Sequence, residues 1–347
     1  MAQKISNILS VKMANMSVLA ACMVVVLHAG EPESVGTSGW WWAQILGGIA
    51  KVAVPYFFLA AGFFLAGHME EPGWYRREMS KRVLTLLVPY LCWCVIWWLF
   101  YLPFGMRADV LHSRPFGYSL FLLDCRFWDI LGLNLFHCPT NSPLWFLRAL
   151  FIVCAASPII YWGSWKMPRA MFGGLLAGYL VLAPDATNHS PCSWLMRYGI
   201  SVFGCFWFSV GVVLRLRYLN YITLQCTNKK WALMCLPIGT LMTLVNVLLR
   251  SHAISVPVEP FAIAFLMVGF FLIMPSRRWH SILVSNTFEL YLLHSIACFV
   301  LSLFLVNTDL WWVLTLKVVL AVILGLSMSL ALKRLFPKVA LVVFGGR

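Results

Sequence analysis

The sequence predicts an all-α integral membrane protein: a single domain over residues 1–347, built as a bundle of about ten transmembrane helices with both termini in the cytoplasm. Hydrophobic residues make up 61% of the chain and charged residues 11%, and the mean hydropathy is +0.84, so little sequence remains for a soluble domain. Most apolar stretches approach or exceed the ~20 residues that cross ~30 Å of hydrocarbon. The connections alternate between rich and poor in lysine and arginine, as in a multi-pass protein.

The ten expected spans follow one another along the whole chain. They cover residues 14–30, 40–67, 82–102, 144–163, 170–183, 195–214, 231–249, 258–274, 281–305 and 310–332, with ends defined to within a few residues. The only long connection, about residues 103–143, is expected on the outer side of the membrane. It is aromatic and partly amphipathic between residues 116 and 136, which leaves open an interfacial or re-entrant helix or a simple cover over the bundle.

Basic residues set the expected orientation. Eighteen of the 26 lysines and arginines lie at the termini or in the even-numbered connections, which the positive-inside rule places in the cytoplasm. We therefore expect a multi-pass membrane protein, in contact with membrane lipids. The same rule accounts for the net charge of +14, and since no basic cluster accompanies a folded nucleic-acid module, we expect no nucleic-acid partner. Residues 11–30 resemble a signal peptide, but nine further spans favour an uncleaved first helix.

The eleven cysteines predict no metal site, because no paired CxxC or His/Cys spacing is present. Cys125, Cys138 and Cys192 fall on the expected outer side, where a bacterial periplasm permits oxidation. One disulfide among these three cysteines is left open.

The chemistry is expected among the ionisable residues that the spans bury, because each is costly in hydrocarbon and normally faces the bundle interior or a wet cavity. These residues are His28, Lys51, Arg148, Glu289, His294 and Lys317. His28 lies near the outer end of the first span, and the ordinary pKa of histidine, about 6.5, suits a proton acceptor at neutral pH. The alternative is an interfacial histidine at a helix end.

Four further segments share a pattern with His28. The second span contains VPYFFLAAGFFL at residues 54–65, the third begins with KRVLTLLVPY at 81–90, the fourth begins with PLWFLRAL at 143–150, and the ninth contains FELYLLH at 288–294. In this order and at these separations they resemble the membrane-bound acyltransferase family 3, over about residues 12–335. Each motif alone occurs in many membrane proteins, whereas five in register are specific.

The resemblance implies an integral enzyme of the bacterial inner membrane that transfers an acyl group, commonly acetyl, from cytoplasmic acyl-CoA to a hydroxyl of a glycan or a lipid-linked sugar. His28 matches the family's histidine in the first helix, its best candidate for catalysis. Acyl-CoA, in the first place acetyl-CoA, is then a donor substrate, and no tightly bound cofactor is expected. Family members of this length carry no appended periplasmic esterase-like domain, so we expect an O-acyltransferase that works alone.

One position departs from the family pattern. The family usually has an arginine eleven residues before the histidine, where this chain has Ser17. Eleven residues of helix leave two side chains about 20° and ~16 Å apart on one face, a spacing that suits two groups on one channel wall. Lys12 lies about 160° from His28 around the helix and is no simple replacement. Lys51 or Arg148, from neighbouring helices, is the candidate cation for a CoA phosphate or for the reacting carbonyl.

Two charged residues of the spans are expected to contact substrate. Arg148 follows Trp145 near the outer end of the fourth span, where its guanidinium either binds a phosphate of a lipid-linked sugar or snorkels to the interface. Glu289 is costly without a partner, so we expect a pairing with Lys317 or Lys51, or a protonated carboxyl. Glu289 is also a candidate substrate contact, because the family usually lacks a carboxylate there.

The remaining candidates are aromatic. Tyr291 and His294 are three residues apart in the ninth span and form one local polar patch, whereas Glu289 lies about 140° from His294. The family has a similar tyrosine and histidine in this helix, which makes both candidates for substrate binding. His137, in the long outer loop, is expected to present a hydrogen-bond donor to an acceptor glycan.

The expected mechanism begins with acyl-CoA that enters from the cytoplasm and extends its thioester into the bundle. His28 removes the proton of the acceptor hydroxyl as the hydroxyl attacks the thioester. Arg148 or Lys51 favours the developing oxyanion.

Two other classes of protein remain open. In a proton-coupled transporter or flippase of a glycan or lipid precursor, His28, Glu289 and His294 are parts of a proton relay. In an inactive membrane protein that only binds a glycan, Ser17 marks the lost chemistry.

Overall fold

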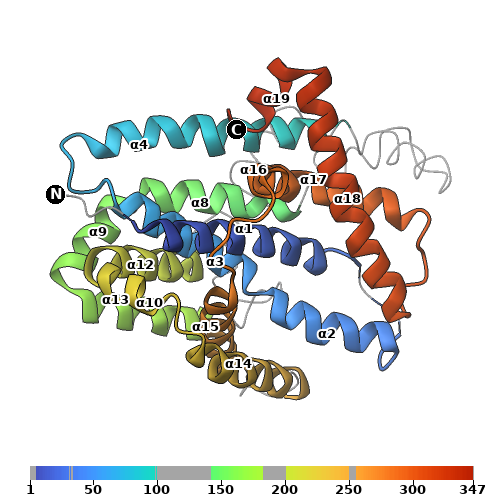
Figure 1. The fold of residues 1–347 in the computed structure, drawn as a ribbon, viewed down its shortest axis with the longest axis horizontal. Helices are drawn as coiled ribbons and strands as arrows, with labels where there is room; N and C mark the ends of the chain where they lie inside the picture. The colour runs from blue at the N-terminus through green and yellow to red at the C-terminus, as the bar shows by residue number, and fades with distance from the viewer. Residues whose placement is uncertain are drawn as a thin grey trace.

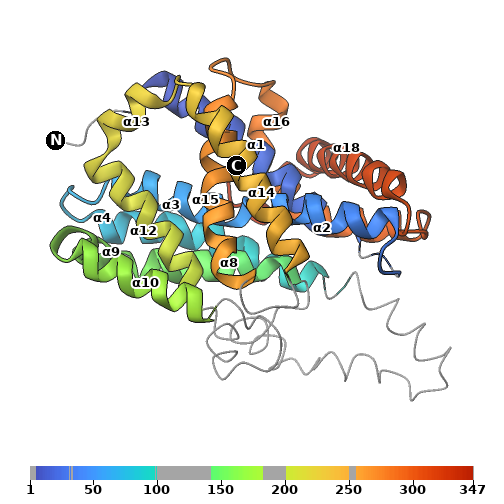
Figure 2. The same ribbon diagram turned by 90° about the horizontal axis from the view of Figure 1, so that it is seen from below.

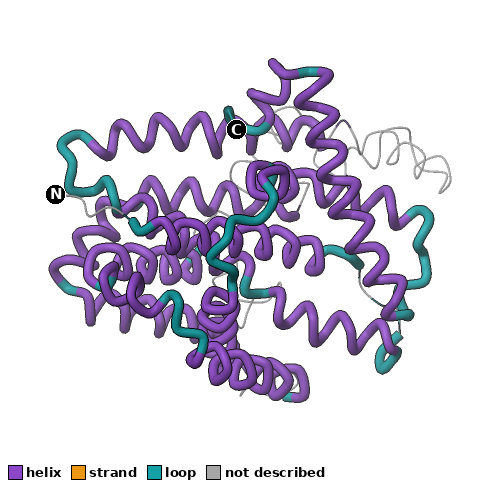
Figure 3. The backbone as a smooth tube through the Cα atoms, viewed as in Figure 1, coloured by secondary structure: helices purple, strands orange, loops and turns teal. Residues whose placement is uncertain are grey.

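The computed structural model describes residues 5–97 apart from 31 and 33, together with residues 99, 142–182, 201–249 and 255–346. Within these ranges every regular element is a helix, as Figure 3 shows, which confirms the all-α class. Most of the predicted outer loop lies outside the described residues, as do His137, Cys125, Cys138 and Cys192. What we expect of them stays a prediction.

The first half of the described chain forms helices that coincide with the first five expected spans. Within the third of these spans, a π-helical segment continues α4 into one long helix, Trp74–Trp97. The elements are α1 (Asn7–Leu27), α2 (Ser38–Ala50), α3 (Ala53–Ala66), α4 (Trp74–Arg82), the π-helical η1 (Val83–Leu87), the 3-10 turn η2 (Ser142–Leu144), α8 (Trp145–Ala155), α9 (Ser157–Lys166) and α10 (Pro168–Leu182).

The second half of the described chain coincides with the last five expected spans and adds two short helices, α13 and α19, that were not predicted. The elements are α12 (Val202–Arg217), α13 (Leu219–Gln225), α14 (Lys230–Leu248), α15 (Ser255–Ile273), α16 (Ser281–Ser285), α17 (Thr287–Ser302), α18 (Trp311–Leu335) and α19 (Pro337–Val343).

Several of these helices have the length and composition of membrane spans. Among the described residues five pass this test, and the bent pairs α8 with α9, at 58°, and α12 with α13, at 91°, raise the number to seven. By contrast, α10 has only 15 residues, which reach ~22 Å, and α17 is only one residue longer. The helices therefore support a membrane protein, while the number of ten crossings and the direction of the termini stay predictions.

The first helix lies inside the bundle. In both Figure 1 and Figure 2, α9, α10, α12 and α13 gather at one end of the molecule and α2 and α18 at the other. Helix α1 packs against α2, α3, α17 and α18. His28, directly after its last residue, contacts α17, whereas its first turns contact the end of α15.

Polar side chains join the first turns of α1 to the end of α15. The ammonium of Lys12 donates to the carbonyl of Leu272 at 2.8 Å, and the Asn15 amide donates to the carbonyls of Pro275 at 3.0 Å and Arg277 at 2.9 Å. The last carbonyls of a helix have no partner within the helix and carry its negative dipole end, so they favour such donors. Buried Lys12 is thereby a structural residue.

Two glycines let α3 and α12 touch along their backbones. A Cβ atom at Gly62 would lie 2.1 Å from the carbonyl oxygen of Phe208, and one at Gly211 would lie 2.0 Å from that of Leu59. No larger residue fits at either position without moving the two helices apart. The small residues of the second expected span thus permit close helix approach, as predicted.

Candidate active site at the end of α1

His28 follows the last residue of α1 and is exposed. Its Nδ1 lies 2.9 Å from the carbonyl oxygen of Val24, one turn earlier in the same helix. Because a carbonyl only accepts, Nδ1 carries the hydrogen of the neutral ring, and Nε2 then carries the lone pair. The helix end therefore orients an accessible proton acceptor.

The ring of His294 supports that of His28. Their centroids are 4.9 Å apart with the rings at 60°, an edge-to-face arrangement, and His294 is fully buried. The Nδ1 of His294 donates to the carbonyl of Tyr291, and its Nε2 lies 3.3 Å from the Ser295 hydroxyl, which donates to it. Both nitrogens of His294 are thus engaged within α17, so this ring fixes the position of His28 by packing rather than by a hydrogen bond.

Tyr291 joins this histidine pair to the beginning of α8. Its ring lies 5.8 Å from that of His294 and 5.5 Å from that of Phe146. Its hydroxyl donates to the carbonyl of Pro143, immediately before α8. The structure therefore brings together His28, Tyr291 and His294, which are three of the predicted site residues from two distant parts of the chain.

The structure does not bring Arg148 into this group. Arg148 is buried, but it lies two residues after Phe146, so the two side chains point about 200° apart around α8. Phe146 contacts the ring of Tyr291, while the charge of Arg148 acts on the Cys94 thiol. Its burial argues against a guanidinium that snorkels to the interface.

Lys51 also lies apart from the histidine pair. It caps the end of α2, and its ammonium pairs with Glu259 of α15 at 3.0 Å, with 46% of the lysine side chain exposed. An ion pair that is this exposed stabilises little.

The expected pairing of Glu289 with Lys317 or Lys51 is wrong. Glu289 is buried near the start of α17, and its Oε1 accepts from Lys333 at 2.6 Å. Lys333 lies near the end of α18, sixteen residues or ~24 Å along the helix from Lys317. The Asn286 side chain accepts from Lys333 at 3.0 Å and from Ser329 at 2.9 Å, which completes a polar cluster between α17 and α18.

Ser17, at the position of the family's arginine, is engaged with its own helix. Its hydroxyl donates to the carbonyl of Met13 at 2.9 Å and lies 3.2 Å from the hydroxyl of Tyr56. The Tyr56 hydroxyl donates to the same carbonyl at 2.6 Å. Both partners of Ser17, the Met13 carbonyl and the Tyr56 hydroxyl, are neutral groups, so this position carries no charge pair.

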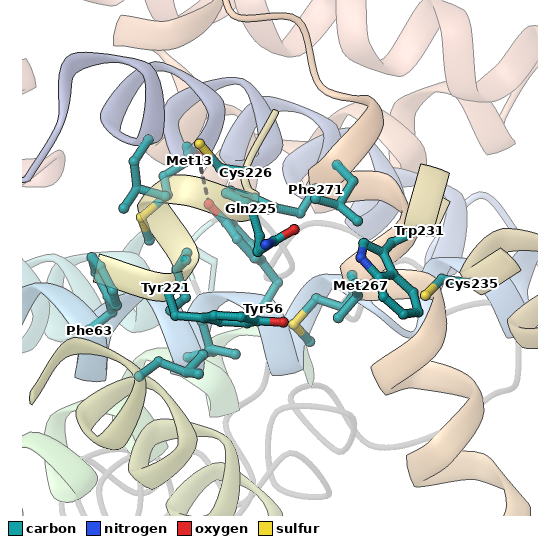
Figure 4. Close-up of a pocket in the computed structure, with 16 residues that line it drawn as sticks. Met13, Tyr56, Phe63, Tyr221, Gln225, Cys226, Trp231, Cys235, Met267 and Phe271 are labelled. Atoms are coloured by element: carbon teal, nitrogen blue, oxygen red, sulfur yellow. Dashed lines mark hydrogen bonds between the residues drawn. The ribbon is translucent and has the colours of Figure 1, made fainter. Parts of the chain in front are cut away.

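A cavity of about 390 Å³ adjoins Tyr56 and was not predicted. Figure 4 shows its aromatic and methionine side chains turned toward one another from α1, α3, α13, α14 and α15. Two of the rings that line it have a cation beside them: the Lys12 ammonium is 5.9 Å from the Phe271 ring, and the Arg215 guanidinium is 5.5 Å from the Phe63 ring. The lining residues come from separate helices, so no local sequence pattern reveals the cavity.

Comparison with known proteins adds one finding. The model of the family described as an acyltransferase domain matches residues 16–334, a range that includes His28 and His294. No curated protein and no solved structure matches the chain.

Proposed function

The chain belongs to the acyltransferase family whose model covers residues 16–334, and from this premise we propose that it is a membrane O-acyltransferase. The acyl group, in the first place acetyl, comes from cytoplasmic acyl-CoA and passes to a hydroxyl of a glycan or a lipid-linked sugar. The observation that carries the proposal is the accessible Nε2 lone pair of His28, oriented through Nδ1 by the carbonyl of Val24.

In this mechanism His28 acts as general base. Its Nε2 accepts the proton of the acceptor hydroxyl while the hydroxyl oxygen attacks the thioester carbonyl. As the bond between the carbonyl carbon and sulfur breaks, the imidazolium returns the proton to the departing CoA thiolate. The ring must keep its orientation through both steps, and the packing of His294 against it supports that requirement.

The engagement of His294 also favours an enzyme over a proton relay. A relay residue has to pass a proton from one nitrogen to the next group. Both nitrogens of His294 already bond within α17, to Tyr291 and Ser295. Glu289, the third member of the relay that we considered, forms an ion pair with Lys333.

The cavity beside Tyr56 is the proposed entrance for the donor. Met13, which lines it, precedes His28 by fifteen residues, or ~22 Å along α1, so an extended donor arm reaches from one site toward the other. Aromatic faces such as those of Phe63 and Phe271 suit an adenine base. The charge of Arg215 beside the Phe63 ring favours a phosphate group.

The test is mass spectrometry of surface glycans and lipid-linked sugars from cells that express the wild type, His28→Ala or an empty vector. His68→Ala is the matched control, because this histidine is exposed and pairs with Glu71 at the surface. We expect an ester-linked acyl increment with the wild type and His68→Ala and none with His28→Ala.

Two results would contradict the proposal. An increment that survives in His28→Ala removes His28 as the base. No increment in any sample, with the protein inserted and acceptors present, favours the transporter or flippase instead.

A further inference from the structure

Lys317 is a buried cation in an unfavourable place. It lies in the second turn of α18, and only 2% of the residue is exposed. A charge buried among helices costs free energy, and a positive charge near a helix N-terminus also opposes the helix dipole. The carboxylate that we expected to compensate it, Glu289, pairs with Lys333 at the other end of α18.

The ammonium lies beside the chain that leaves the catalytic histidine. A Cβ atom at Gly30 would be 3.1 Å from the Lys317 nitrogen and 3.3 Å from a methyl carbon of Thr308. Gly30 is two residues beyond His28, so their Cα atoms are at most about 7.6 Å apart. Gly30 also has φ of +134°, which side chains rarely tolerate, and the glycine thus leaves room for the ammonium.

Among the described residues, no carboxylate forms an ion pair with Lys317. The Cys298 thiol of α17 lies within electrostatic range. The nearby Asp309 carboxylate accepts from the backbone N–H of Ser34 at 2.9 Å and lies 3.3 Å from the Thr37 hydroxyl. These bonds hold Asp309 to the start of α2.

We propose that Lys317 binds a phosphate group of the acceptor and so selects a lipid-linked sugar phosphate over a neutral glycan. The inference rests on the proposed function, because it gives the acceptor a chemical class. An ammonium is a compact charge that suits a phosphate group. A phosphate held there lies at the His28 end of α1. A sugar attached to that phosphate can then place a hydroxyl within reach of His28.

The first experiment measures binding without turnover. Purified protein in detergent is titrated with farnesyl diphosphate, a phosphate-bearing lipid, or with farnesol, its neutral counterpart, while thermal unfolding is followed. We expect farnesyl diphosphate to stabilise the wild type, Lys317→Arg and the control Lys338→Met, whose lysine is exposed on α19. Lys317→Met is expected to bind at least about tenfold more weakly, with farnesol unaffected.

Several outcomes would overturn the inference. One is equal binding of farnesyl diphosphate by the wild type and Lys317→Met, and another is no binding by the wild type. If Lys317→Met does not fold, Lys317→Gln is measured instead against Lys317→Arg. A third outcome concerns Glu31, which follows Gly30 and lies outside the described residues. If Glu31→Gln and Lys317→Met each weaken the binding of farnesyl diphosphate and of farnesol to the same extent, Lys317 is only a structural partner of Glu31.

A second experiment separates this inference from the proposed function. Acyl transfer from acetyl-CoA is measured to one sugar, presented either on a polyprenyl diphosphate or as a neutral alkyl glycoside. Lys317→Met is expected to raise KM for the phosphate-bearing acceptor about tenfold and to leave the neutral acceptor unchanged. An equal fall in kcat for both acceptors overturns the inference. Lys317-dependent binding without any transfer by the wild type contradicts the proposed function alone.

Discussion

Two positions in the first half of α17 carry buried polar groups that the protein treats in opposite ways. Near its start, Glu289 pairs with Lys333 at 2.6 Å, and Asn286 adds hydrogen bonds to the same cluster. Five residues later, buried His294 is neutral and holds the exposed ring of His28. We call these the ion-pair cluster and the histidine pair.

The difference between them indicates what each does. In the ion-pair cluster the opposite charges meet inside the protein, so the ion pair stabilises the packing of α17 against α18. In the histidine pair, His294 is satisfied within its own helix, while the Nε2 of His28 keeps a lone pair for another molecule. Four substitutions test this distinction, from the largest expected effect to the smallest.

His28→Gln is expected to have the largest effect on the reaction. Loss of a general base costs about 10²–10⁴-fold in rate, whereas an exposed side chain at a helix end contributes little to folding. The acyl-transfer rate and the thermal unfolding midpoint of the purified protein are measured together. An unchanged rate, or a collapse of stability, would place His28 with the structural residues.

Glu289→Ala is expected to have the largest effect on stability. Removing one partner of a buried ion pair costs about 3–5 kcal/mol because the other charge is left uncompensated. The double variant Glu289→Gln with Lys333→Met is expected to recover much of that loss. Thermal unfolding in detergent measures both. If Glu289→Ala is stable but inactive, Glu289 acts on substrate, and the ion-pair cluster is not purely structural.

His294→Phe is expected to have an intermediate effect. It keeps an aromatic ring beside His28 but loses the bonds to Tyr291 and Ser295 that fix the ring. We expect kcat to fall about tenfold, since a small displacement of a catalytic group is costly. The fall of kcat should exceed any change in KM. A loss as large as that of His28→Gln would instead make His294 a second acid or base.

Ser17→Ala is expected to have the smallest effect. It removes one hydrogen bond to the Met13 carbonyl, and Tyr56 still donates to that carbonyl, so stability should fall by about 1 kcal/mol or less. Acyl-transfer activity should be retained, as measured by KM for acyl-CoA. A large rise of that KM would show that Ser17 takes the place of the family's arginine in donor binding.

Much of this fold could be predicted because hydropathy is a local property. Each expected span coincides with one or more helices, and the small residues around Gly62 correctly indicated a close helix contact. The breaks inside spans were not predicted. The 58° bend between α8 and α9 and the end of α16 at Ser285 lie inside expected spans, where hydropathy does not distinguish a straight helix from a broken one.

The sequence by itself determined the helical class, the family and the candidate residues, because hydrophobicity and motif spacing are written along the chain. Only the tertiary structure decided which candidates meet. In the structure the ring of His28 packs against His294, Glu289 pairs with Lys333, and Lys317 lies beside Gly30. Pairing depends on which helices are neighbours and at what height their residues lie, and both follow from the packing of the whole bundle rather than from any single segment.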